Sequence, residues 1–413
     1  MGAAPDPGFF GSPTTKGATM FLRHSSSPVH GFKRASRAGA VLASLLLAGA
    51  VALPVAAQET ITTAKLGAVY AFSGPVAIYS TTIKNGLDMA VAELNAKGDL
   101  KIDLVLEDDR STKDDAINVY QKFIQRDQAL LIFGPLIGGQ VFAAGPLAQR
   151  AKVPVMLTSV ATPGVTLIGD HIFRTSVESA AIIPATVKTA KDLLKTARVA
   201  QIYTNDDQFS VGEFKAYEAA LKANGIQIAG AETVRTGDVD FSAQLTKIKA
   251  MNVDTLVVSS QGQEVVGILT QARKLGLDKV RFIGGNAFNA AGVVKEAGAA
   301  MEGALSATPW FLAMEHPKNV EFVKKYRDKY KSEPDWLAAQ TYDAVYIVKQ
   351  ALLAAKIGKD DSVAVARTKL RDSLAAIKTY DGVLGKIEFD EKRDPRVAGA
   401  VIKVESGKHV IAK

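Results

Sequence analysis

Six short stretches rich in small and polar residues follow predicted β-strands along the chain. They are "FSGP" (72–75), "GPLIGG" (134–139), "TSVATPG" (158–164), "TNDDQFS" (204–210), "SSQGQ" (259–263) and "GGNAFN" (284–289). Gly138 and Gly139 stand ahead of a predicted helix, where free backbone N–H groups suit a carboxylate, and Thr162 adds a hydroxyl. Each stretch alone is an ordinary turn. Together, with no nucleophile among them, they favour a binding cleft over an enzyme.

Sequence signatures of catalysis and of metal binding are missing. The sequence has no G-x-S-x-G, H-E-x-x-H or G-x-x-x-x-G-K-[ST] motif. It has no Cys, which excludes disulfides, thiolate metal sites and thiol catalysis. His171, His316 and His409 are widely separated and are interpreted as surface or structural histidines. "EDDR" (107–110) is interpreted as a solvated strand end beside Arg110 in preference to a metal site. We expect no enzymatic activity, no metal and no cofactor.

The elements that must position these turns follow a β–α–β rhythm. Strand-like runs at 65–72, 101–109, 129–134 and 153–159 alternate with helical patterns at 83–94, 113–126 and 138–151. The rhythm restarts with strands at 198–206, 226–234, 253–260 and 280–285 and helices at 211–225, 240–252 and 264–276. Helices at 319–330, 336–356 and 362–377 and strands at 385–390 and 399–413, the last with a Ser406-Gly407 turn, complete the chain. Such repeats predict an α/β fold of parallel sheets that binds ligands at the carboxyl ends of its strands.

Length and charge limit the class of protein. With 413 residues, 47% of them hydrophobic, the chain is long enough for two or more domains. Residues 1–57 hold five Lys or Arg and one Asp, which accounts for +4 of the formal net charge of +8. The remainder intersperses Lys with Glu, as solvated surfaces do, and has no footprint for nucleic acid.

The N-terminal region has the pattern of a secretory signal peptide. The basic segment "KRASR" precedes the apolar stretch 38–57, and the small residue Ala57 stands directly before a cut at Gln58. We predict that residues 1–57 are an N-terminal extension and signal peptide. A membrane anchor that is retained is the alternative.

The order of these stretches resembles the branched-chain-amino-acid type of periplasmic substrate-binding protein, the receptor component of ABC importers. The matching stretches are "SGPVAIYS", "NGLDMAVAELNAKG", "VLEDDRSTKDDA", "VPVMLTSVAT", "DFSAQLTKIKAMNVDTLVVS", "TQARKLGL", "FIGGNAFN" and "QTYDAVY". The resemblance runs from about Ala64 to Val410. It implies the type I periplasmic-binding fold, in which two doubly wound parallel-sheet lobes are joined by three hinge crossovers and the ligand is trapped between them.

The resemblance also implies lobe bounds and partners. The crossovers are expected near Ser176, Thr308 and Gly385. Lobe 1 is then 58–176 plus 309–384, and lobe 2 is 177–308 plus 385–413. The protein is expected to be a monomer in the periplasm whose partners are a small-molecule ligand and an ABC transporter permease.

Site residues follow from the resemblance one at a time. The predicted ligand-binding residues are Tyr79, Gly138, Gly139, Val160, Ala161, Thr162, Phe209, Gln261, Asn286 and Tyr342. Gly138, Gly139 and Thr162 match positions that hold the ligand carboxylate, and Val160 matches one whose carbonyl accepts from the ammonium. Tyr79, Phe209 and Tyr342 match aromatic positions. The turn Ser73-Gly74-Pro75 is expected to end the first strand so that Tyr79 faces the ligand, with plain packing of Tyr79 as the alternative.

Three departures from the family prototype bear on the ligand. A serine is replaced by Gly138, a glutamate for the ligand ammonium is replaced by Asn286, and two cysteines are replaced by Ser111 and Ile137. Acids that could supply the missing charge are Asp206, Asp207, Glu264 and Asp343. We expect a periplasmic receptor for a small carboxylate-bearing solute, with an amino acid of the branched-chain type preferred. The alternatives are an aromatic or keto carboxylate without an amino group, or a ligand sensor for a regulator.

Overall fold

The structure, a computed structural model, describes residues 59–412. The predicted signal peptide and the cleavage site near Ala57 and Gln58 lie outside these residues. Among the residues that are described, no helix combines the length and the apolar character needed to cross a membrane.

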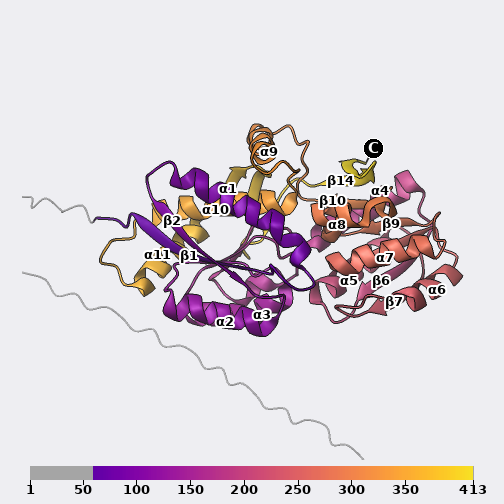
Figure 1. Cartoon of the computed structure of the whole chain (residues 1–413), viewed down its shortest axis with the longest axis horizontal. Helices are drawn as coiled ribbons and strands as arrows, with labels where there is room; N and C mark the ends of the chain where they lie inside the picture. The colour runs from indigo at the N-terminus through magenta and orange to yellow at the C-terminus, as the bar shows by residue number, and fades with distance from the viewer. Residues whose placement is uncertain (1–58, 413) are drawn as a thin grey trace, which may run out of the picture. The chain divides into compact units, whose positions relative to one another are not determined.

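The first sheet has five parallel strands in the order β2-β1-β3-β4-β5. These are β1 (Thr63–Tyr70), β2 (Lys101–Asp108), β3 (Ile132–Phe133), β4 (Val155–Leu157) and β5 (Ile172–Arg174). One face packs against α1 (Ser80–Asn95), α10 (Trp336–Ala355) and α11 (Val363–Ala376), and the other against α2 (Lys113–Gln121) and α3 (Gly138–Arg150). Helix α9 (Pro317–Tyr330) lies outside this layer, against α1 and α10. Successive residues of a strand point to opposite faces, so Ala68 joins the first core and Val69 the second (Figure 1).

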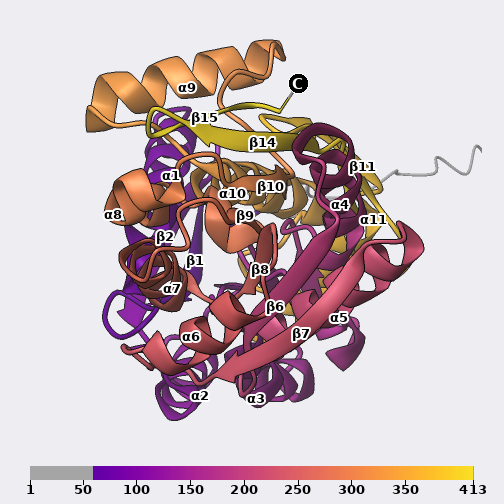
Figure 2. The same ribbon diagram turned by 90° about the vertical axis from the view of Figure 1, so that its right-hand side faces the viewer.

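The second sheet has seven strands in the order β15-β14-β10-β9-β8-β6-β7, of which β14 and β15 run antiparallel to their neighbours. These are β6 (Arg198–Thr204), β7 (Gln227–Val234), β8 (Thr255–Ser259), β9 (Arg281–Gly284), β10 (Leu305–Thr308), β14 (Ala400–Glu405) and β15 (Lys408–Ile411). Figure 2 shows α4 (Ser179–Leu194) and α5 (Gln208–Ala223) on one face, and α6 (Ser242–Ala250), α7 (Gly262–Lys274) and α8 (Ala291–Ala297) on the other.

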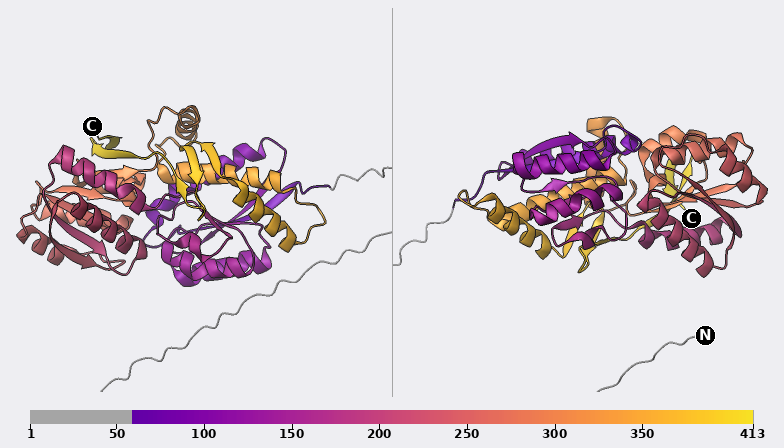
Figure 3. Two further views of the ribbon diagram at one scale, coloured as in Figure 1. Left: turned by 180° about the vertical axis from the view of Figure 1, so that it is seen from behind. Right: turned by 90° about the horizontal axis from the view of Figure 1, so that it is seen from below.

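A third, small antiparallel sheet belongs to the same part of the molecule as the first sheet (Figure 3). It is formed by β11 (Thr379–Gly382), β12 (Gly385–Phe389) and β13 (Pro395–Arg396). Asp343 of α10 accepts hydrogen bonds from the backbone N–H groups of Val383 (2.9 Å) and Leu384 (3.1 Å) between its strands. The chain therefore passes between the two large sheets after β5, after β10 and between β13 and β14. The last passage was predicted earlier in the chain, near Gly385. The predicted bounds of the two lobes remain a prediction.

The predicted α/β class, with mostly parallel sheets, is confirmed. The Ser406-Gly407 turn joins β14 to β15, with φ of 51° and 70°. The strand expected at 129–134 is only β3, Ile132–Phe133. Elements β5, β10, β11, β13, α4 and α8 were not predicted. Strand β5 has three residues, too few for a periodic pattern, and α4 carries Pro184 inside the helix, where proline usually signals a break.

Candidate functional site

A cavity of about 370 Å³ lies where loops from both large sheets meet. Its lining residues are Tyr79, Leu136, Gly138, Ser159, Ala161, Thr162, Phe209, Gln261, Asn286, Ala287, Trp336 and Leu337. All but the last two follow the carboxyl ends of strands, three in the first sheet (β1, β3 and β4) and three in the second (β6, β8 and β9). Open α/β sheets place their ligand sites at such edges.

Seven of the ten predicted residues line this cavity, namely Tyr79, Gly138, Ala161, Thr162, Phe209, Gln261 and Asn286. Gly139, Val160 and Tyr342 do not. The Val160 carbonyl accepts a hydrogen bond from Ser176 Oγ (2.6 Å), and the Tyr342 hydroxyl donates to Glu93 Oε2 (2.7 Å). Gly139, the second residue of α3, lies beside the Lys113 side chain.

The turn after β1 directs Tyr79 toward the cavity. Ser73 Oγ donates to Asp108 Oδ2 (2.7 Å) at the end of β2, and Gly74 has a φ of +87°, which favours glycine. The chain then enters a short 3-10 helix, Ala77–Tyr79, and the Tyr79 side chain is buried. Burial, with a smaller contribution from Glu264, raises the pKa of Tyr79 well above its usual value, so this phenol stays protonated.

Two of the three carboxylates of "EDDR" accept hydrogen bonds from the backbone, and the third, Glu107, pairs with Lys122 (2.8 Å). Asp108 accepts from the N–H of Phe72 (2.9 Å), and Asp109 accepts from the N–H of Ser111 (3.0 Å). Arg110 pairs with Asp115 instead of with the strand-end acids. Among residues 59–412, no group of three His, Cys, Asp or Glu side chains is placed to hold a metal ion.

The wall of the cavity on the side of the first sheet, here called the first wall, contains Gly138, Ala161 and Thr162. A Cβ atom on Gly138 would lie 2.2 Å from Thr162 Oγ1, so glycine is what allows the threonine to reach the start of α3. That helix start has no side-chain cap. Unpaired N–H groups and the helix dipole give this end a partial positive charge. The first wall therefore suits a carboxylate.

The opposite wall, here called the second wall, contains Phe209, Gln261 and Asn286. Both polar atoms of the Asn286 side chain are buried without a protein partner. A carboxyl group stands directly behind each amide residue. Gln261 Nε2 donates to Asp207 Oδ2 (3.2 Å), and the backbone N–H of Asn286 donates to Glu213 Oε1 (3.3 Å). The second wall thus presents neutral amides in front of buried acids.

Burial governs the acids behind the second wall. It raises the pKa of Glu213 to about 8 and also raises the pKa of Asp207 and of Glu264. Glu264 accepts from the N–H of Gly237 (2.8 Å), and its other carboxyl oxygen has no hydrogen-bond partner. Of the acids considered from sequence, Asp343 is bonded to the small sheet, and Asp206 accepts from Thr236 (2.9 Å).

Sequence reasoning missed five lining residues, namely Leu136, Ser159, Ala287, Trp336 and Leu337. The first three stand inside the turns that were singled out, so the turns themselves were the signal. Trp336 opens α10, far from those turns, and only the fold brings it there. Ser159 Oγ and Trp336 Nε1 are buried without a partner and add a possible acceptor and a donor to the cavity. The position of Glu213 behind the cavity was also not predicted, because in the sequence it is an ordinary polar residue of an amphipathic helix.

The chain is similar in sequence to known solute-binding proteins. A family model described as periplasmic binding protein matches residues 63–408. The Leu/Ile/Val-binding protein homolog 1 of Brucella suis is 30% identical over 342 residues, which cover 81% of this chain and 88% of the relative. The Leu/Ile/Val-binding protein of Escherichia coli is 27% identical and covers 84% of this chain and 92% of the relative.

Solved structures are also similar to this chain. The branched-chain amino acid transporter substrate-binding protein of Streptococcus pneumoniae, in complex with isoleucine, is 28% identical with a TM-score of 0.76 and covers 84% of this chain and 97% of its own. A solute-binding protein of an ABC transporter from Rhodopseudomonas palustris, in complex with 3,4-dihydroxybenzoic acid, is 25% identical with a TM-score of 0.73. It covers 83% of this chain and 93% of its own.

Proposed function

This chain belongs to the periplasmic binding protein family, a family of solute-binding proteins, and from that premise we propose that it captures an amino acid with an apolar side chain and delivers it to the permease of an ABC importer. The lobes that close on the ligand are those built on the first and second sheets. The ligand-binding residues are the seven predicted residues that line the cavity, together with Ser159 and Trp336.

The observation that carries this proposal is the opposite character of the two cavity walls. The first wall offers the uncapped start of α3 and the Thr162 hydroxyl, which suit a carboxylate. The second wall has the unpaired Asn286 Oδ1 and, behind Gln261, the Asp207 carboxyl, and these acceptors suit an ammonium. A zwitterion spanning the cavity satisfies both walls. Ala161, Phe209, Ala287 and Leu337 leave apolar surface for an aliphatic side chain.

A second candidate, an aromatic carboxylate without an amino group, is favoured by a different observation. No charged side chain lines the cavity itself, and burial keeps Glu213 protonated at neutral pH. The Rhodopseudomonas palustris relative in complex with 3,4-dihydroxybenzoic acid supports the same alternative. An aromatic acid would place its carboxylate at the first wall and hydrogen-bond Asn286 through a ring substituent.

Calorimetry with matched pairs separates the two candidates. We expect leucine to bind more tightly than 2-oxo-4-methylpentanoate, and phenylalanine more tightly than 3-phenylpropanoate, because within each pair only the amino acid carries an ammonium that can donate to the second wall. If the compound without nitrogen binds better in each pair, the amino-acid proposal is wrong and the aromatic or keto acid replaces it. Mass spectrometry of the ligand released from natively purified protein is an independent check.

We also propose that the protein is exported, that its signal peptide is cleaved between Ala57 and Gln58, and that the mature protein acts as a monomer. The family supports a periplasmic location. N-terminal sequencing of the exported protein should begin near Gln58. A chain that still carries the stretch 38–57 and fractionates with membranes would contradict cleavage.

A further inference from the structure

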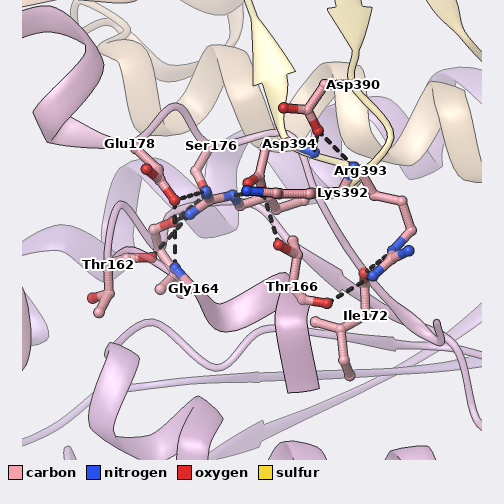
Figure 4. A network of polar contacts seen from close by, with 12 residues as sticks. Thr162, Gly164, Thr166, Ile172, Ser176, Glu178, Asp390, Lys392, Arg393 and Asp394 are labelled. Atoms are coloured by element: carbon pink, nitrogen blue, oxygen red, sulfur yellow. Dashed lines mark hydrogen bonds and ion pairs between the residues drawn. The ribbon is translucent and has the colours of Figure 1, made fainter. Parts of the chain in front are cut away.

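Arg174, the last residue of β5, is a fully buried cation behind the first wall. Its Nε donates to Asp394 Oδ1 (2.6 Å), its Nη1 donates to the Thr162 carbonyl (3.0 Å), and its Nη2 bonds to Glu178. A buried charge is tolerated only when it is paired and hydrogen-bonded. Figure 4 shows Thr162, Glu178 and Asp394 within one network of polar contacts.

The partners of Arg174 come from three different segments. Thr162 belongs to the turn that follows β4 and lines the cavity. Glu178 directly precedes α4, on the first passage from the first sheet to the second. Asp394 directly precedes β13, the strand of the small sheet that leads into the last passage. One side chain therefore joins the ligand turn to the first passage and to the segment that leads into the last passage.

Further bonds run between the same segments. Glu178 Oε1 also accepts from the Gly164 N–H (3.4 Å), and Asp394 Oδ1 accepts from Thr166 Oγ1 (3.0 Å). Ser176 Oγ donates to the Val160 carbonyl (2.6 Å). Both ends of the turn 160–166 are thus bonded, one to the first passage and the other to the segment that leads into the last passage. A change in the geometry of either passage must alter these bonds or move the turn.

We propose that Arg174, with Glu178 and Asp394, is a positioning unit that couples the ligand turn to the passages between the lobes. Arg174 does not line the cavity, but it holds the Thr162 carbonyl while the Thr162 side chain reaches the ligand. The three nitrogens of the planar guanidinium each reach a different partner, and the single nitrogen of a lysine ammonium cannot occupy all three of these positions. The inference rests on the proposed function where it is tested by calorimetry with leucine. The hydrogen-exchange test uses the ligand-free protein and does not depend on the proposed function.

The test compares Arg174→Lys with Arg367→Lys. Arg367 is also buried and donates to two backbone carbonyls, those of Ala129 (2.9 Å) and Ile124 (3.1 Å), but it has no part in the cavity. Hydrogen exchange of the ligand-free proteins is measured first. In Arg174→Lys we expect faster exchange in residues 158–166, 175–179 and 394–399 together. In Arg367→Lys exchange should rise only around 124–131 and α11.

Calorimetry with leucine is the second measurement. Arg174→Lys should raise the dissociation constant about tenfold or more, because hydrogen bonds to a charged group are lost, whereas Arg367→Lys should change it less than about twofold. If Arg174→Lys fails to fold, Asp394→Asn is used, with the same expectation for exchange and affinity. Unchanged leucine affinity, or exchange confined to β5, overturns the coupling role. If the wild type itself does not bind leucine, the proposed function fails, and the exchange pattern alone decides the inference.

Discussion

Helices α3 and α5 both begin at the cavity, but their first turns are completed differently. At the start of α5, Asp207 accepts from the backbone N–H of Ser210 (3.0 Å) and from its hydroxyl (2.7 Å). At the start of α3, Ile137 has no side-chain acceptor, and Gln140 Oε1 accepts from the Ile137 N–H (3.3 Å). A capped helix satisfies its own N–H groups, whereas an uncapped one leaves them for a ligand. The difference explains why an anion is expected at α3 and a cation near α5.

The substitution Ile137→Asp removes this difference and should have the largest effect. An acid at position 137 forms a capping box with Gln140 and brings a negative charge to the first wall. We expect the dissociation constant for leucine to rise by more than about 100-fold, since apposed like charges cost several kcal/mol. The helix cap should raise the free energy of unfolding by about 1 kcal/mol. Calorimetry and urea denaturation measure the two quantities.

The variant Ile137→Asn is the control for that experiment. It offers a neutral cap to the same N–H groups, so it should weaken leucine binding less than Ile137→Asp does. Equal affinity in wild type and Ile137→Asp would show that the start of α3 does not bind the carboxylate.

The substitution Thr162→Ala removes the other donor of the first wall. A hydrogen bond to a charged group contributes about 1.5–3 kcal/mol, so the dissociation constant should rise about 10- to 150-fold. The fold should be kept, because only the side-chain hydroxyl and a methyl group are lost. Calorimetry on the folded variant checks this. An unchanged affinity would make Thr162 an ordinary turn residue.

The acid behind the second wall predicts a pH dependence of stability. Burial raises the pKa of the Glu213 carboxyl to about 8 in the native state, whereas the ordinary pKa of a glutamate is 4.5. Between these values the native state binds more protons than the unfolded state, so the free energy of unfolding falls as the pH rises. The slope from one such group is at most about 1.4 kcal/mol per pH unit.

The variant Glu213→Gln isolates this contribution. Asp109 and Asp343 also have raised pKa values, near 6 and 7, and contribute to the pH dependence in both proteins. We expect the ligand-free variant to gain stability over the wild type between pH 5 and pH 8, as measured by urea denaturation. A constant difference across this range would mean that Glu213 titrates normally in the native protein.

The substitution Tyr342→Phe lies outside both walls and should have the smallest effect. The Tyr342 hydroxyl donates to Glu93, which also accepts from the Tyr346 hydroxyl (2.8 Å) and so keeps a partner in the variant. We expect a loss of about 1 kcal/mol in the free energy of unfolding and less than a twofold change in leucine affinity. A tenfold loss of affinity would return Tyr342 to the ligand site, as the family resemblance suggested.

Most of the candidate site was predictable because its residues stand in turns with a local signature. Small and polar residues directly after strands placed Gly138, Thr162, Gln261 and Asn286 at one edge of each sheet, and they line the cavity. Val160 does not line the cavity, and no local sequence pattern indicates this. Its carbonyl is bonded to Ser176, whose position depends on the passage after β5. The direction of one carbonyl is set by the partner that reaches it.

The sequence by itself determined the α/β class, the restart of the β–α–β rhythm and the edge at which a ligand binds, because periodicity and turn chemistry are local properties. Only the tertiary structure decided which charges face the site. It placed Glu213 behind Asn286 and bonded Asp343 to the small sheet, although both are acids on helices. It also enclosed Arg174 between Glu178 and Asp394, more than 200 residues apart in the chain. Burial and pairing of a charge depend on everything packed around it, and that packing is not encoded in any short stretch of sequence.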